Sequence, residues 1–225
     1  MLKQITLTGA DNETYIPDLI AISERYPFVE WGILLCDRKM GSPRYPAYSW
    51  IQSLLKRKTP TMRISLHICS KFNRNSALIT AKRRGILYDE FDRIQFNCGT
   101  KYYISQCIRR IGYIPAVSSR NIIVGGDFRE IDEIPEYISP LFDCSGGNGI
   151  EMSHINTPYS NSKYCGYAGG LNTLNIFNIN QVIADTVGET DYWLDMETSL
   201  RAGGIKFNTG KCIEVLNIME PLINA

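Results

Sequence analysis

Short apolar runs rich in β-branched residues recur along the chain, separated by glycine, proline or polar residues. Runs of this length and composition are typical of buried strands. Eight are found: QITLTG (4–9), VEWGILLC (29–36), RISLHIC (63–69), RIQFNC (93–98), NIIVGG (121–126), PLFDC (140–144), YCGYAGG (164–170) and YWLDME (192–197). The pattern therefore predicts eight strands.

Several of the intervening stretches place apolar residues three and four positions apart, which predicts amphipathic helices. They are IPDLIAISERY (16–26), AYSWIQSLLKRK (47–58), SALITAKRRG (76–85), YYISQCIRRIG (102–112), LNIFNINQVIADTVG (174–188) and TGKCIEVLNIM (209–219). The helical pattern is weakest after PLFDC. Alternating strands and helices call for a parallel sheet, and eight strands favour a closed (β/α)8 TIM barrel over an open doubly wound sheet. No linker divides the chain, so we expect an α/β protein with a single barrel domain over residues 1–225.

The overall charge of the chain gives no indication of a nucleic-acid or membrane partner. The chain has 225 residues, 44% of them hydrophobic, and a formal net charge of +1, so nothing in its overall charge marks it as a nucleic-acid or anionic-membrane binder. The N-terminal segment turns polar too soon for a signal peptide, and no apolar run reaches the roughly 18 residues of a membrane span. We expect a cytoplasmic protein, a monomer or a homodimer. Seven cysteines without a CxxC pair argue against a zinc site, and no cofactor is expected.

In a (β/α)8 barrel the active site lies at the carboxyl ends of the strands, so the polar residues that end the predicted strands are candidate site residues. Asp143 ends the sixth run and directly precedes a glycine-rich loop. The other polar or thiol groups at strand ends are Thr8, Cys36, Asp37, His67, Asn97, Cys98, Asp127, Asp195 and Glu197. We take Asp143 as the principal acid or base, with a partner among Cys36, Cys98, Asp127 and Glu197. The alternative is that such residues cap helices or pair with Arg and Lys.

Two glycine-rich turns follow the sixth and seventh runs. Glycine lets backbone N–H groups approach a ligand closely, as in loops that hold anions. Barrel enzymes frequently bind phosphate between the loops after strands seven and eight, which is where the second turn falls. We therefore expect a small anionic ligand, held by Thr8, Asn97, Gly146, Gly147, Gly149, Gly169, Gly170 and Asn172. Tight turns alone would also explain the glycines.

The motifs TLTGADN (6–12), SPRY (42–45), DCSGGNG (143–149), AGGLN (168–172) and DMETS (195–199) together resemble phosphoribosylanthranilate isomerase in order and spacing. The resemblance implies a phosphate-binding barrel that performs an Amadori rearrangement of an aminoaldose phosphate. In that family a Cys ending the first strand is the base, and an Asp ending the sixth strand is the acid. Asp143 matches the acid, and Arg44 matches the Arg that helps to hold the anthranilate portion of the substrate.

The sequence also departs from the family pattern. Thr8 stands in place of the basic Cys, and a neutral hydroxyl without an activator takes a carbon-bound proton poorly. We therefore do not expect efficient isomerisation of phosphoribosylanthranilate. Asn97 replaces a His in the fourth strand. Glu197 replaces a Ser in the eighth and brings an anion beside the expected phosphate, unless Arg201 neutralises it.

Three functional hypotheses remain open. The first is an isomerase or lyase that transfers protons on a small phosphorylated or carboxylated metabolite. The second is a catalytically inactive barrel that serves as a binding or interaction protein, which the Thr8 substitution favours. The third uses the carboxylates Asp127, Asp143, Asp195 and Glu197 as oxygen ligands for Mg²⁺ or Mn²⁺.

Overall fold

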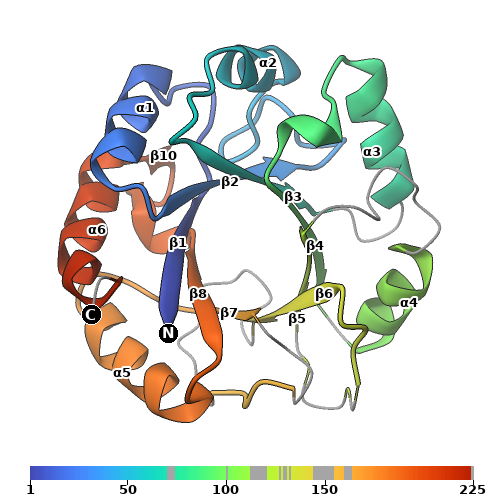
Figure 1. Cartoon of the computed structure of the whole chain (residues 1–225). Helices are drawn as coiled ribbons and strands as arrows, with labels where there is room; N and C mark the ends of the chain where they lie inside the picture. The colour runs from blue at the N-terminus through green and yellow to red at the C-terminus, as the bar shows by residue number, and fades with distance from the viewer. Residues whose placement is uncertain are drawn as a thin grey trace.

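Eight parallel strands form a closed barrel at the centre of the computed structural model, with the helices outside it (Figure 1). Each strand pairs with the next in sequence, and β8 returns to β1 to close the ring. The structure describes residues 1–69, 74–99, 101–111, 121–126, 128, 131, 133–143, 155–159 and 164–223. The closed parallel barrel confirms the predicted fold class.

All eight predicted strands are present. They are β1 (Leu2–Thr8), β2 (Val29–Leu35), β3 (Arg63–Ile68), β4 (Arg93–Gly99), β5 (Asn121–Gly126), β6 (Ile138–Asp143), β7 (Tyr164–Ala168) and β8 (Asp191–Met196). A short antiparallel pair, β9 (Arg201–Ala202) and β10 (Lys206–Phe207), follows the barrel. Apolar side chains fill the space between strands and helices, so burial on that face accounts for the runs seen in the sequence.

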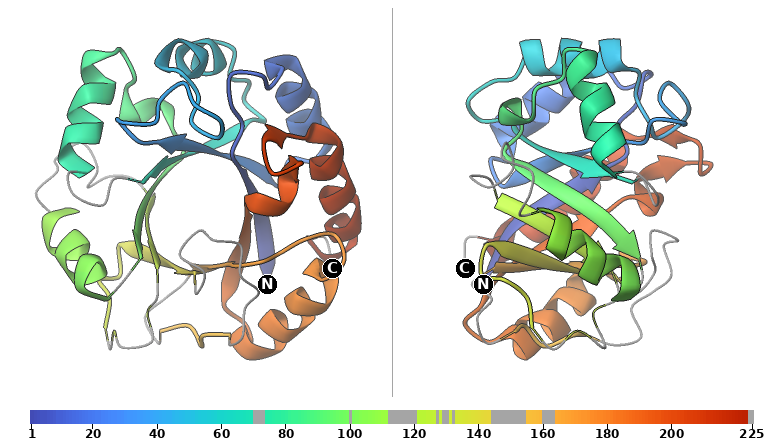
Figure 2. Two further views of the ribbon diagram at one scale, coloured as in Figure 1. Left: turned by 180° about the vertical axis from the view of Figure 1, so that it is seen from behind. Right: turned by 90° about the vertical axis from the view of Figure 1, so that its right-hand side faces the viewer.

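In the described part of the chain, six α-helices lie outside the strands, and Figure 2 shows them around the barrel. They are α1 (Ile16–Arg25), α2 (Tyr48–Lys56), α3 (Arg74–Arg83), α4 (Lys101–Ile111), α5 (Ile176–Val187) and α6 (Thr209–Ile223), with 3-10 turns η1 (Tyr88–Glu90) and η2 (Thr198–Leu200). Each matches a predicted helix. Helix α6 continues past its predicted end at Met219 and includes Pro221, which removes only one backbone donor near the end of the helix. Among the described residues, no helix has the length and apolar character needed to cross a membrane.

The barrel interior is divided into a polar side and an apolar side. On the polar side, Arg93 donates from Nε to Glu30 Oε2 at 2.8 Å, and Thr6 Oγ1 donates to Glu30 Oε1 at 2.9 Å. The Arg93 guanidinium also stacks 4.4 Å from the ring centroid of Trp193. The apolar side is a cluster of Ile123, Leu141, Ala168 and Trp193. The buried ion pair of Arg93 and Glu30 therefore lies inside the barrel, beneath its mouth.

We expect Glu30→Gln to lower the free energy of unfolding by about 3–5 kcal/mol, because it leaves the buried Arg93 charge without its partner. Urea unfolding of the purified protein measures this. The matched control is Glu220→Gln, which breaks the solvent-exposed pair with Arg25 and should have a much smaller effect. Equal losses in the two variants would contradict a structural role for the interior pair.

Candidate functional site

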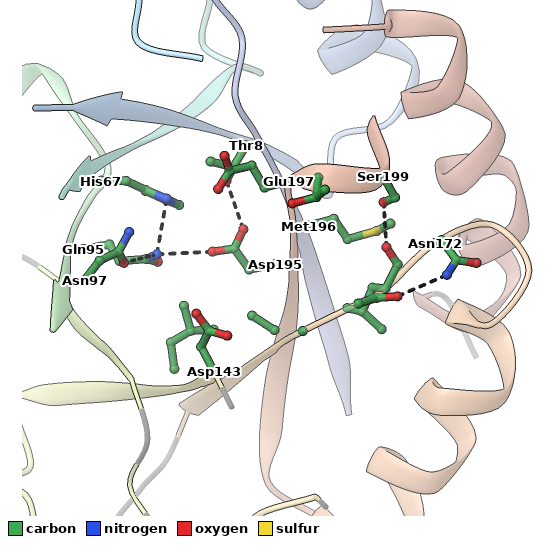
Figure 3. Close-up of a pocket in the computed structure, with 16 residues that line it drawn as sticks. Thr8, His67, Gln95, Asn97, Asp143, Asn172, Asp195, Met196, Glu197 and Ser199 are labelled. Atoms are coloured by element: carbon green, nitrogen blue, oxygen red, sulfur yellow. Dashed lines mark hydrogen bonds between the residues drawn. The ribbon is translucent and has the colours of Figure 1, made fainter. Parts of the chain in front are cut away.

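A cavity of about 200 Å³ opens at the carboxyl ends of the barrel strands (Figure 3). Its walls come from the ends of β1, β3, β4, β6, β7 and β8 and from the segments after β7 and β8. The lining residues are Thr8, His67, Gln95, Asn97, Leu141, Asp143, Ala168, Gly169, Gly170, Leu171, Asn172, Asp195, Met196, Glu197, Thr198 and Ser199. The cavity thus lies where this fold ordinarily has its active site.

Asp195 of β8 is a buried carboxyl group on the cavity floor. Thr8 Oγ1 donates to its Oδ1 at 2.9 Å, and Gln95 Nε2 donates to its Oδ2 at 3.2 Å (Figure 3). Burial raises the pKa of Asp195 to about 7, although the hydrogen bonds from Thr8 and Gln95 lower it in part. Asp195 is therefore a carboxyl group that gains and loses its proton near neutral pH.

His67 and Gln95 complete the floor of the cavity. Gln95 Nε2 lies 3.2 Å from His67 Nδ1 and 2.9 Å from Asn97 Oδ1. Burial, with the charge of Arg93, lowers the pKa of His67 to about 3, so its ring is neutral. Gln95 Nε2 has two hydrogens and faces three acceptors, so its contact with His67 Nδ1 does not fix which ring nitrogen carries the proton. Within the described chain, His67 Nε2 and Gln95 Oε1 have no hydrogen-bond partner, which leaves two unpaired polar atoms buried at the floor.

Gly32 of β2 makes room for this arrangement. A Cβ at this position would lie 2.1 Å from Thr8 Oγ1 and 2.7 Å from His67 Cε1. Neither approach is sterically possible, so a larger residue would displace one of these two side chains. A glycine inside an otherwise apolar strand is a sequence signal for such close packing.

The rim of the cavity carries two further carboxyl groups, Asp143 at the end of β6 and Glu197 after β8. Glu197 Oε1 lies 3.1 Å from Arg44 Nη1. Burial raises the pKa of Glu197, the charges of Arg44 and Arg201 oppose that rise, and the charge of Asp143 adds to it. Arg44 adopts a left-handed backbone conformation with φ of 75°, and Asp11 Oδ2 accepts its N–H at 3.2 Å. Arg44 thus neutralises Glu197 from outside the cavity.

The turn after β7 brings backbone to the cavity wall. Gly169 and Gly170 have φ of 131° and 60°, values that L residues rarely adopt. Asn172 Nδ2 donates to Gly170 O at 3.1 Å, and Ser199 Oγ donates to Leu171 O at 2.6 Å. The second bond ties the segments after β7 and β8 together, so the structure shows Asn172 shaping the turn.

The structure gathers many of the expected site residues and leaves others away from the cavity. Those that line it are Thr8, Asn97, Asp143, Gly169, Gly170, Asn172 and Glu197. Cys36 does not line it; its backbone N–H faces Met40 Sδ at 3.3 Å. Cys98 is buried in the hydrophobic core, because neighbouring residues of a strand point to opposite faces and Asn97 points inward. The candidates outside the described residues are Asp127, Gly146, Gly147 and Gly149.

Metal binding by the carboxylates finds no support in the described part of the chain. No group of three or more His, Cys, Asp or Glu side chains there is arranged to hold a metal ion. Asp127, which belonged to the proposed ligand set, lies outside that part.

The floor of the cavity is formed by inward-facing residues within the strands, which the sequence analysis does not predict as site residues. The sequence places His67 and Asp195 at strand ends, but it gives His67 no firm role and Asp195 a role only as a possible metal ligand. Gln95 and Gly32 are not among its candidates. The missed signal is the alternation in β4, where Arg93, Gln95 and Asn97 are polar and two residues apart. Alternate residues of a barrel strand face the interior, so such a series indicates a polar barrel centre.

Comparison with known proteins extends the picture of the fold. No protein-family model matches the chain, and no curated protein matches it in sequence. Among solved structures, phosphoribosyl anthranilate isomerase from Thermus thermophilus is 14% identical with a TM-score of 0.61, over 97% of this chain and 99% of that one. A phosphoribosyl anthranilate isomerase in complex with reduced 1-(o-carboxyphenylamino)-1-deoxyribulose 5-phosphate is 13% identical with a TM-score of 0.60, over 98% of this chain and 100% of that one. The Thermotoga maritima enzyme is 13% identical with a TM-score of 0.58, over 100% of this chain and 99% of that one. At this identity the likeness shows the shared barrel fold.

The raised pKa of Asp195 predicts a pH-dependent effect of Asp195→Asn on stability. The protonated carboxyl stabilises the folded state fully below the unfolded pKa of 3.8, and this stabilisation is lost as the pH rises to about 7. The free energy of unfolding of the variant minus that of the wild type should therefore increase across this range. His67 contributes the opposite slope in both proteins and cancels in the difference. Urea unfolding at several pH values tests this, and a difference independent of pH would contradict it.

Proposed function

We propose that the chain is an enzyme, an isomerase or lyase, that transfers protons on a small polar metabolite bound in the mouth cavity. The observation that carries the proposal is the buried Asp195 carboxyl, whose pKa of about 7 suits proton exchange at neutral pH. Asp143 lines the same cavity from another strand and is half-buried. Two carboxyl groups in unlike environments are a usual way to provide an acid and a base in one site.

Asp143 is proposed as the acid and Asp195 as its partner. Thr8 stands where the resembling family has its basic Cys, but the Thr8 hydroxyl donates its hydrogen to Asp195 at 2.9 Å. It therefore orients the carboxyl group and does not itself accept a proton. The expected partners fit this role less well, because Cys36 does not line the cavity and Glu197 is paired with Arg44.

The substrate is proposed only as a small polar metabolite of the cytoplasm. The Gly169–Gly170 turn supports the expected anionic ligand, and a structurally similar isomerase is known with a phosphorylated ligand. The carboxyl groups of Asp143 and Glu197 on the same cavity oppose it. Thr8 in place of the basic Cys argues against phosphoribosylanthranilate as the substrate.

A second candidate function is a barrel that binds a small molecule without transforming it. The hydrogen bond from Thr8 to Asp195 favours it, because both groups are then satisfied without any ligand. Chemical conversion of a bound metabolite would distinguish the enzyme from the binding barrel.

Solvent deuterium provides a test that does not require a known substrate. The protein is incubated in D₂O with a small-molecule extract, and mass spectrometry detects metabolites that exchange carbon-bound hydrogen for deuterium. We expect exchange with the wild type, and a loss of about 10²–10⁴-fold in Asp143→Asn and Asp195→Asn, which keep size but remove acid–base capacity.

The matched control is Asp185→Asn on the exposed face of α5, which should exchange at the wild-type rate. Absence of exchange above a protein-free sample would favour the binding barrel. Exchange that persists in both site variants would show that other groups move the proton.

A further inference from the structure

Two cysteines stand opposite each other where strands β2 and β3 end at the barrel mouth. The last register pair of these strands is Leu35 with Ile68, and the N–H of Cys69 donates to Leu35 O at 3.0 Å. In a parallel ladder a residue donates to the carbonyl just before its partner, so this bond makes Cys36 the partner of Cys69. Neighbouring strands lie about 4.8 Å apart. The Cα atoms of a disulfide lie about 4.4–6.8 Å apart, so the pair has the spacing that a disulfide needs.

The side chains of both cysteines belong to the mouth of the barrel. Leu35 and Ile68 lie in the hydrophobic core, and successive side chains of a strand point to opposite faces. Asn97, which lines the cavity, donates from Nδ2 to Cys69 Sγ at 3.2 Å. Burial raises the pKa of Cys69 to about 12, and a charge on Cys36 adds to the rise, so the two thiols are close enough to interact.

This pair also differs from the other described cysteines in its access to solvent. Cys36 and Cys69 are partly exposed. The buried ones are Cys98, Cys107, Cys165 and Cys212. A thiol reacts with an oxidant only where the oxidant can reach it. Among the cysteines in the described part of the chain, access and a neighbouring thiol therefore coincide at Cys36 and Cys69.

We propose that Cys36 and Cys69 are a redox modification site, which forms a reversible disulfide with a small-molecule disulfide such as oxidised glutathione as the oxidant. Cys36 loses its proton to water, and its thiolate attacks one sulfur of the oxidant as a glutathione thiolate leaves. Cys69 then loses its proton, attacks the Cys36 sulfur and displaces the second glutathione thiolate. The protein gives up two electrons and two protons, and oxidised glutathione becomes two molecules of reduced glutathione.

The order of the two steps follows from the surroundings of Cys69. Burial raises its pKa, so few Cys69 thiols are ionised at neutral pH, and the thiolate is the attacking species. We therefore assign the first attack to Cys36. An excess of reduced glutathione runs the exchange backwards and restores both thiols.

Disulfide formation reaches the floor of the cavity through Asn97. Strand β3 lies between β2 and β4, so Cys36 and Asn97 approach Cys69 from opposite sides. Asn97 Oδ1 lies 2.9 Å from Gln95 Nε2, which also lies 3.2 Å from Asp195 Oδ2. Turning the Cys69 sulfur toward Cys36 takes it away from Asn97. Oxidation therefore removes one contact of a residue that touches the network at the floor.

Peptide mapping of the folded wild-type protein tests the pairing. The protein is equilibrated with mixtures of reduced and oxidised glutathione, quenched with acid, alkylated and digested, and mass spectrometry measures the amount of each cysteine pair. We expect the disulfide between Cys36 and Cys69 to exceed every other cysteine pair by about tenfold or more. The preference should disappear in urea, where the strands no longer hold the two thiols together.

Matched variants separate this pair from general oxidation of thiols. Cys69→Ser should leave glutathione attached to Cys36, because the thiol that displaces it is gone. Cys36→Ser should leave Cys69 without a disulfide to another cysteine. The control is Cys107→Ala, which changes a buried cysteine of α4 and should form the disulfide between Cys36 and Cys69 as the wild type does.

The side-chain amide signals of Asn97 in an NMR spectrum of ¹⁵N-labelled protein test the connection to the cavity. They are identified by their loss in Asn97→Asp. We expect them to shift on oxidation and to return on reduction, whereas the signals of Asn180, which accepts a hydrogen bond from Tyr192 Oη at 2.9 Å, should stay in place.

The inference is overturned if the folded protein shows no preference for the disulfide between Cys36 and Cys69. It is equally overturned if that disulfide forms and the Asn97 signals do not move. Neither measurement depends on turnover, so both outcomes are independent of the proposed function.

Discussion

The hydrogen bond from Thr8 to Asp195 connects the first strand of the barrel to the last and sets the character of the cavity between them. The two residues are 187 positions apart in sequence, and closure of the ring by β1 and β8 brings their side chains to 2.9 Å. Gln95 approaches the same carboxyl group from β4, on another side of the barrel. Removal from water raises the pKa of Asp195, and the hydrogen bonds from Thr8 and Gln95 hold the group in place while opposing that rise in part. Barrel closure, which buries the carboxyl group, therefore creates the acid–base group.

The rest of the interior is arranged around this network. Gly32 leaves the space that Thr8 and His67 occupy, and the Glu30–Arg93 pair closes the barrel beneath them. The apolar cluster around Trp193 fills the other side of the interior. Polar groups that are packed and hydrogen-bonded in this way hold one geometry. His67 and Gln95 line the cavity, and His67 Nε2 and Gln95 Oε1 have no hydrogen-bond partner in the described part of the chain.

Much of the fold could be predicted because each buried strand or helix needs apolar residues at its buried positions, and this pattern can be read within the element's own sequence. The strands of a parallel barrel are covered by helices, so their outward residues form apolar runs, and strand ends such as Asp143 and Gly169 could be placed at the mouth from the fold's polarity alone. The floor of the site could not be predicted in this way. Which inward residues meet depends on register and stagger across the barrel, and the sequence does not display that Thr8, Gln95 and Asp195 converge. Asn97 and Cys98 are a further example. They are adjacent in sequence, but Asn97 lines the cavity whereas Cys98 lies in the hydrophobic core.

The proposed chemistry depends on the protonation of Asp195, and a ¹³C NMR titration of the aspartate side-chain carboxyl carbons measures it most directly. The signal of Asp195 is identified by its loss in Asp195→Asn. The hydrogen-bonded, buried carboxyl group described here predicts a titration midpoint near pH 7. A midpoint near 4, the ordinary value for an aspartate in water, would contradict it and remove the acid–base group on which the proposed chemistry depends.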